Sequence, residues 1–123
     1  MSQRIEPLQA VMTENGFDAL ILIQSRDILY YTGTAQPSWL VVLPGAHRLF
    51  VRRGLDRALS ESSLDPSSIE PQRKQGGVFS FLREQNLPKR PVVGTELDVL
   101  PVGLWNGWKA ETPDWEYRDV SSY

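Results

Sequence analysis

Residues 17–43, FDALILIQSRDILYYTGTAQPSWLVVL, decide the fold that this sequence predicts. Phe17–Ile23 is a short apolar run of the kind that forms a strand buried on both faces. Trp39–Leu43 is a second apolar run, rich in β-branched and aromatic residues, and it predicts another buried strand. The chain is therefore organised around a pair of buried strands.

The segment between these strands is expected to hold one helical turn and a glycine turn. Asp27 can cap a single turn from Ile28 to Tyr31, and Gly33 can take the left-handed conformation that ends it. The loop 34–38 then leads into the second strand. Because functional residues concentrate on such loops, this one is the best functional candidate in the chain.

The second strand is followed by a turn signal, Pro44-Gly45-Ala46, and by an alternating run, His47–Arg52. Two strands joined by so short a link predict an antiparallel hairpin. The remaining expected elements are a helix over 2–15, a helix over 55–64, a short edge strand over 68–74, a helix over 78–86, a strand over 90–95, a helix from Pro101 and a strand over 115–118.

Helices and strands therefore alternate along the chain, with one hairpin among them. This order predicts the α/β class, as a three-layer α/β/α sandwich. The hairpin makes the sheet mixed rather than purely parallel. A length of 123 residues predicts a single domain.

Composition excludes several classes of function. There is no cysteine, which excludes disulfides, thiolate zinc sites and thiol catalysis, and which fits a cytoplasmic protein. The net charge of -2 gives no reason to expect a nucleic-acid partner or an anionic membrane surface. No apolar run approaches the ~20 residues that span a bilayer, and the first residues lack the apolar core of a signal peptide. A soluble globular domain is expected.

Three blocks carry a resemblance to a known family. They are Gly16-Phe17-Asp18-Ala19-Leu20, Asp27-Ile28-Leu29-Tyr30-Tyr31-Thr32-Gly33 and Trp39-Leu40-Val41-Val42-Leu43. In this order they resemble the N-terminal domain of the creatinase, prolidase and aminopeptidase P family. Weaker similarity continues through Val93-Gly94-Thr95-Glu96, Leu100-Pro101 and Arg118-Asp119-Val120-Ser121. The resemblance thus covers nearly the whole chain and implies a sandwich with a ribonuclease-H-like motif, which agrees with the element order.

The resemblance also implies what the chain does. Residues 1–123 would be one non-catalytic N-terminal domain, and the catalytic C-terminal domain of the family would be absent from the chain. In the family that second domain holds two divalent metal ions (Mn, Co or Zn) with two Asp, one His and two Glu. The parent protein would be a homodimeric Xaa-Pro peptidase of aminopeptidase P or prolidase type, while this chain would hold no cofactor and catalyse nothing by itself.

In the family, the region of loop 34–38 reaches toward an active site, often that of the neighbouring subunit. The resemblance therefore implies that this loop restricts substrate access, with Tyr31, Gln36, Trp39 and Arg53 as the candidate rim. Aminopeptidase P has a tryptophan at the position of Leu29, so that aromatic contact is absent here. The loop also lacks the Phe and Arg of creatinase, which favours a peptidase parent over a creatinase.

Apart from the resemblance, the residues offer little catalytic chemistry. His47 is the only histidine, and no serine lies in a Gly-x-Ser-x-Gly elbow. Asp18 lies at the start of one predicted strand and Asp119 at the end of another, and a nuclease of the ribonuclease H type would need acids at strand ends around a bound metal. Two carboxylate pairs are interpreted as surface groups: Glu96 with Asp98, and Asp114 with Glu116.

Two alternatives remain open beside the non-catalytic domain. One is a free-standing binding or dimerisation module that kept the fold, in which Trp105, Trp108 and Trp115 would form an exposed patch, although these residues are most simply core. The other is a hydrolase in its own right, which needs a metal or a nucleophile that the sequence does not supply.

Overall fold

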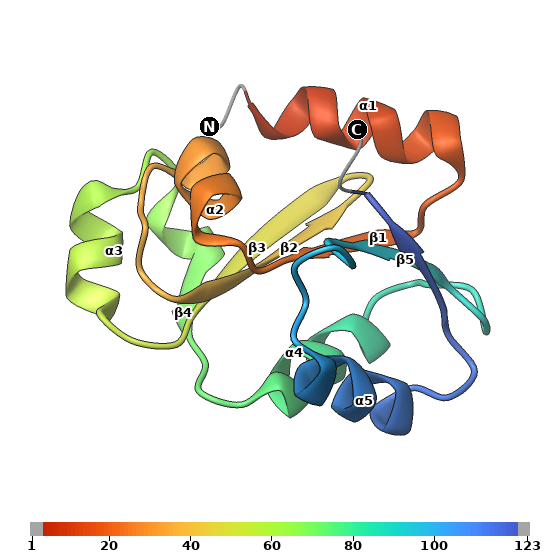
Figure 1. Ribbon diagram of the computed structural model, residues 1–123. Helices are drawn as coiled ribbons and strands as arrows, with labels where there is room; N and C mark the ends of the chain where they lie inside the picture. The colour runs from red at the N-terminus through yellow and green to blue at the C-terminus, as the bar shows by residue number, and fades with distance from the viewer. Residues whose placement is uncertain (1–3, 121–123) are drawn as a thin grey trace.

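The computed structural model describes residues 4–120 and contains one six-stranded sheet with helices on both faces (Figure 1). Its strands are β1 (Ala19–Leu22), β2 (Ser38–Leu43), β3 (Ala46–Val51), β4 (Ile69–Pro71), β5 (Val92–Thr95) and β6 (Glu116–Asp119). Its helices are α1 (Ile5–Asn15), α2 (Ser25–Thr32), α3 (Leu55–Glu61), α4 (Gln75–Arg83), α5 (Val102–Glu111) and a short 3-10 turn, η1 (Pro66–Ser68). The predicted three-layer α/β/α sandwich is confirmed.

The strand order in the sheet is β4-β3-β2-β1-β5-β6. Strand β2 is antiparallel to both of its neighbours, and the other pairs of adjacent strands are parallel. The predicted hairpin joins β2 to β3, with Leu43 paired with Ala46, and makes the sheet mixed. All strands except β2 therefore end at the same edge of the sheet, which we call the carboxyl edge, and β2 begins there.

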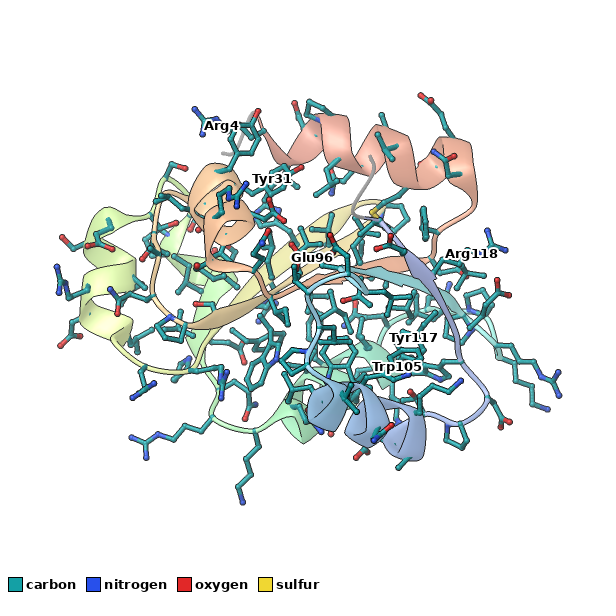
Figure 2. All side chains as sticks on the ribbon, in the orientation of Figure 1. Arg4, Tyr31, Glu96, Trp105, Tyr117 and Arg118 are labelled. Atoms are coloured by element: carbon teal, nitrogen blue, oxygen red, sulfur yellow. The ribbon has the colours of Figure 1, made fainter. Side chains whose placement is uncertain are left out.

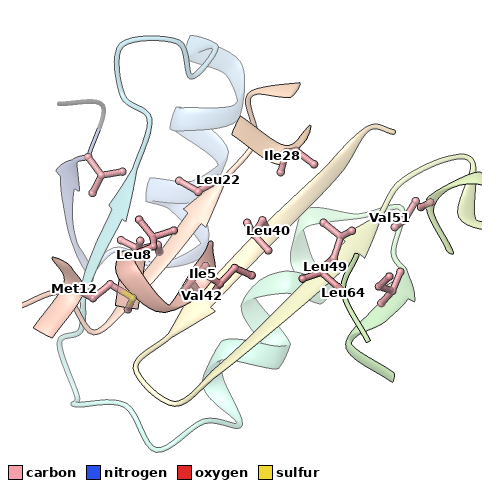
Figure 3. Packing of buried hydrophobic residues seen from close by; sticks show 14 of the residues in the cluster. Ile5, Leu8, Met12, Leu22, Ile28, Leu40, Val42, Leu49, Val51 and Leu64 are labelled. Carbon is pink, nitrogen blue, oxygen red and sulfur yellow. The ribbon is translucent and has the colours of Figure 1, made fainter. Parts of the chain in front are cut away.

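One face of the sheet is covered by α1, α2 and α3 (Figures 1 and 3). Alternate residues of the strands point to this face, as Leu20 and Leu22 of β1 do, because successive side chains of a strand point to opposite sides. They pack against the apolar stripe of α1 (Ile5, Leu8, Met12) and against Ile28 of α2 and Ala58 of α3. This first core is built mainly from the first half of the chain, and Leu64, Ile69 and Val120 complete it.

The other face is covered by α4 and α5. Ala19 and Ile21 of β1 point to this side and pack with an aromatic-rich core that contains Trp39, Phe50, Phe79 and Trp108. All residues of β1 and β2 are buried, so the two apolar runs at the start of the chain form strands buried on both faces, as predicted.

Helix α2 is longer than predicted. It runs from Ser25 to Thr32, with Gln24 rather than Asp27 at its N-cap position, and Gly33 ends it with a φ of 87° as expected. The Gln24 backbone N–H donates instead to a carboxylate oxygen of Glu96, 2.9 Å away. The prediction of Asp27 as the cap is therefore wrong, because the helix begins two residues earlier and Asp27 lies in its first turn.

Helix α4 begins at Gln75, ahead of the predicted start at residue 78. Gly76 and Gly77 were expected to precede the helix and instead lie in its first turn. The Gln72 amide lies against Gly77, in the space that a side chain at this position would occupy. The other predicted elements differ from the observed ones only at their ends. Residues 2–3 of the first predicted helix lie outside the described residues.

Candidate functional site

The loop predicted to carry function lies at the carboxyl edge, between α2 and β2. Gly33 adopts a positive φ, and a side chain there would come within 3.1 Å of the Glu61 carbonyl oxygen at the end of α3. Thr34 is buried, and its hydroxyl donates to Glu61 Oε1 at 2.8 Å. The Ser63 N–H in turn donates to the Thr32 carbonyl at 2.9 Å. The loop is therefore fastened at its start to the C-terminal end of α3.

The second half of the loop is fastened to the end of β3. The Arg52 N–H donates to the Pro37 carbonyl at 2.8 Å. The Gln36 side chain lies against Gly54, whose φ is 76° and where any Cβ would overlap the Gln36 amide. Gln36 and Arg53, two of the predicted rim residues, are therefore neighbours at the surface.

Trp39, the third predicted rim residue, is buried with 3% of its surface exposed. Its ring packs in the core on the α4 and α5 side of the sheet, and the Arg52 guanidinium lies over it, 5.0 Å from the ring centroid. Trp39 therefore does not itself reach the rim. Its contribution is to hold Arg52, because an arginine over an aromatic face is attracted by the ring electrons.

Three arginines form a shallow depression at this place, which we call the arginine depression: Arg52, Arg53 and Arg73. It encloses about 380 Å³. Arg73 joins the other two because β4 runs parallel to β3 and the Gln72 N–H donates to the Val51 carbonyl at 2.9 Å. All three side chains are exposed.

Tyr31, the fourth predicted rim residue, lies apart from the arginine depression, on α2. It is half-buried against the core on the α1 side, and its ring meets that of Tyr30 edge-on at 4.9 Å. Burial raises the pKa of the Tyr31 hydroxyl, with a smaller contribution from the Asp27 carboxylate. Tyr30 is the more exposed of the pair, at 55%, with the Arg4 guanidinium 4.5 Å from its ring centroid.

A buried acid, Glu96, lies at the end of β5 and faces the start of α2, the helix that carries Tyr31 (Figure 2). Only 3% of Glu96 is exposed. Its Oε1 accepts the N–H groups of Ile23 and Gln24 at 2.7 and 2.9 Å. No donor among residues 4–120 reaches its Oε2. Burial, and after it a side-chain hydrogen bond with Asp27, raises the pKa of Glu96 to about 7.

The other acids do not assemble a catalytic site in the described part of the chain. Asp18 precedes β1 and accepts the Val92 N–H at 2.7 Å, whereas Asp119 ends β6 and accepts the Leu97 N–H at 3.1 Å. Since β1 and β6 run in the same direction, these acids lie at opposite edges of the sheet, and the nuclease interpretation is wrong. Within residues 4–120, no group of three or more His, Asp or Glu side chains is placed to hold a metal ion.

The tryptophans of the C-terminal part are mainly core residues. Trp108 is 1% exposed and its Nε1–H donates to Gln75 Oε1 at 2.9 Å. Trp105 packs edge-on against Tyr117 at 5.3 Å and lines a small apolar groove of about 270 Å³ (Figure 2). The groove is completed by Leu97, Leu100 and Val102. The exposed side chain here is thus Val102, at 72%, rather than a tryptophan.

A comparison of the sequence with known protein families identifies the family of this chain. The sequence profile of the Creatinase/Prolidase N-terminal domain matches residues 4–123. The chain belongs to this family. No curated protein matches the sequence.

Solved structures share the fold of this creatinase/prolidase N-terminal domain. Prolidase from Pyrococcus furiosus has a TM-score of 0.78 at 20% identity, over 95% of this chain and 35% of its own. X-Pro aminopeptidase from Thermotoga maritima MSB8 has a TM-score of 0.82 at 14% identity, over 95% of this chain and 33% of its own. The Creatinase/Prolidase N-terminal domain of an X-Pro dipeptidase from Streptococcus pyogenes has a TM-score of 0.77 at 17% identity, over 98% and 95%. The chain spans about a third of the prolidase and the aminopeptidase.

Sequence reasoning missed two features of this creatinase/prolidase N-terminal domain. Arg73 was not among the rim candidates, because it lies inside the edge strand predicted over 68–74. The observed strand β4 ends at Pro71, which leaves Arg73 in the following loop beside the end of β3. Glu96 was interpreted as a surface group. Its position just after a strand rich in apolar residues is the one local hint of burial.

Proposed function

We propose that this chain is the non-catalytic N-terminal domain of a metal-dependent Xaa-Pro peptidase of aminopeptidase P or prolidase type. The observation that carries the proposal is the family match over residues 4–123, combined with relatives that are about three times as long as the matched region. The rest of such a parent supplies the catalytic domain with its two divalent metal ions. The parent acts in the cytoplasm as a homodimer.

In this proposal the domain contributes to subunit association and restricts access to the active site. The rim consists of the loop 34–38 together with the arginine depression beside it. Two properties of this rim support an access role. Its loop is anchored at both ends by backbone hydrogen bonds, and its exposed residues include Ala35 and Pro37, which are neutral and small enough to lie against another polypeptide. Gln36 and Arg53 contact the incoming peptide or the neighbouring subunit, while Trp39 supports them from below.

The coding sequence beyond Tyr123 tests the domain assignment. We expect the reading frame to continue into a segment that supplies two Asp, one His and two Glu as metal ligands, because the described residues place no such group together. A stop codon directly after Tyr123 in the natural gene would contradict the proposal.

A further inference from the structure

We propose that the arginine depression, Arg52, Arg53 and Arg73, binds the carboxylate side chains of an acidic protein segment. The proposal rests on the proposed function, because it names the chemistry of the surface that contacts this part of the rim. Its basis is a concentration of positive charge on a chain whose net charge is -2.

The charges of the depression are available to a ligand. Neither Arg53 nor Arg73 has an ion-pair or hydrogen-bond partner within residues 4–120. Other arginines within residues 4–120 pair with acids. Arg83 lies 3.0 Å from Glu111, and Arg118 lies 2.5 Å from Glu116. Unpaired like charges close together repel one another, so an anionic partner that enters between them relieves this repulsion as well as forming new bonds.

Arg52 and the backbone beneath the depression are held in place, which lowers the entropy that a ligand must remove on binding. Arg52 is fixed over the Trp39 ring, and its backbone N–H is bonded to Pro37. The segments that carry Arg53 and Arg73 leave adjacent parallel strands side by side. Guanidinium groups bind carboxylates through paired N–H donors, so this arrangement suits two or more carboxylates presented together.

The surroundings favour carboxylates of a protein over phosphates of a nucleic acid. Single-stranded nucleic acids need exposed aromatic rings on which bases stack, and the one aromatic ring at this place, Trp39, is buried beneath Arg52. Two uncharged residues lie beside these arginines: the Gln36 side chain lies against Gly54, and the Pro37 carbonyl accepts the Arg52 N–H at 2.8 Å. Arginine itself is among the residues enriched at protein interfaces.

The test measures binding of a short fluorescein-labelled peptide, in which glutamate alternates with serine, to the purified 123-residue chain at low ionic strength. Arg53→Gln with Arg73→Gln is expected to weaken binding about tenfold, since each substitution removes charge-assisted hydrogen bonds. The matched control is Arg26→Gln with Arg90→Gln, which removes the same charge from exposed positions outside the depression. The control is expected to stay within about twofold of the unaltered chain. Circular dichroism of both double variants verifies that they are folded.

Three results would overturn the proposal: no binding of the glutamate peptide, equal losses in the two double variants, or tighter binding of inorganic phosphate or of a single-stranded oligonucleotide than of the peptide. The assay needs neither a catalytic domain nor peptidase activity. A failure here therefore leaves the domain assignment standing, whereas a stop codon after Tyr123 leaves the binding result standing.

Discussion

Replacing Trp108 with alanine is expected to lower the free energy of unfolding by about 3–5 kcal/mol, the usual cost of deleting a large buried aromatic side chain. The Trp108 ring is fully buried between helices α4 and α5 and the sheet. It packs edge-on against Phe79, with the centroids 5.8 Å apart, and lies 6.2 Å from the Tyr117 ring. Alanine would leave a cavity lined by these rings, and it would also leave Gln75 Oε1 without its donor.

Urea unfolding followed by far-UV circular dichroism measures this loss. Val102→Ala is the matched control, because Val102 is on the same helix but 72% exposed, and its removal should change stability by less than about 0.5 kcal/mol. A typical domain is stable by only about 5–15 kcal/mol, so Trp108→Ala is expected to be near the limit of folding. A loss below about 1 kcal/mol would show that the second core is packed differently from the one described.

The second large effect is a pH dependence that comes from Glu96. Its pKa is raised from 4.5 to about 7, first by burial and then by the hydrogen bond to the Asp27 carboxylate. Between these two values the unfolded chain releases the proton while the folded chain keeps it, so stability falls as the pH rises through this interval and is constant above it. One pKa unit corresponds to about 1.4 kcal/mol, so Glu96 costs the folded chain about 3 kcal/mol at pH 8.

Glu96→Gln should remove this cost. Glutamine keeps an oxygen for the N–H groups of Ile23 and Gln24, and its amide can donate to Asp27 as the protonated acid does. We expect the variant to be more stable than the unaltered chain at pH 8, and the difference to shrink by about 2 kcal/mol when the pH is lowered to 5. Other titrating groups such as His47 are present in both proteins and cancel in this difference.

Urea unfolding of both proteins between pH 5 and pH 8 provides the measurement. Glu84→Gln is the matched control, because it makes the same substitution at an exposed position of the chain. Parallel stability profiles for the unaltered chain and Glu96→Gln would contradict a buried, proton-carrying Glu96.

The sequence predicted the features that depend on local patterns. The apolar runs of β1 and β2 are buried on both faces, and the turn at Pro44-Gly45 produces the hairpin, because both follow from side-chain burial and turn chemistry within a few residues. The left-handed Gly33 ends α2 for the same kind of reason. These elements were sufficient to predict the mixed three-layer sandwich.

Features made by contacts between distant segments were not predictable from local patterns. Glu96 accepts the Gln24 N–H although it lies 72 residues further along the chain, so no pattern near Asp27 indicated this contact. The arginine depression likewise depends on the pairing of β3 with β4, which brings Arg73 beside Arg52 and Arg53. Trp39 was expected at the rim because it adjoins the loop. Side chains alternate between the two faces along β2, however, and the Trp39 ring points into the core.

The central proposal is that this domain is non-catalytic and that the catalytic centre belongs to another domain of the parent protein. Cleavage of a Xaa-Pro peptide by the purified chain, with Mn²⁺, Co²⁺ or Zn²⁺ supplied in turn, tests that claim most directly. We expect no turnover above the rate that the metal alone gives. Metal-dependent release of the N-terminal residue by the purified chain would contradict it.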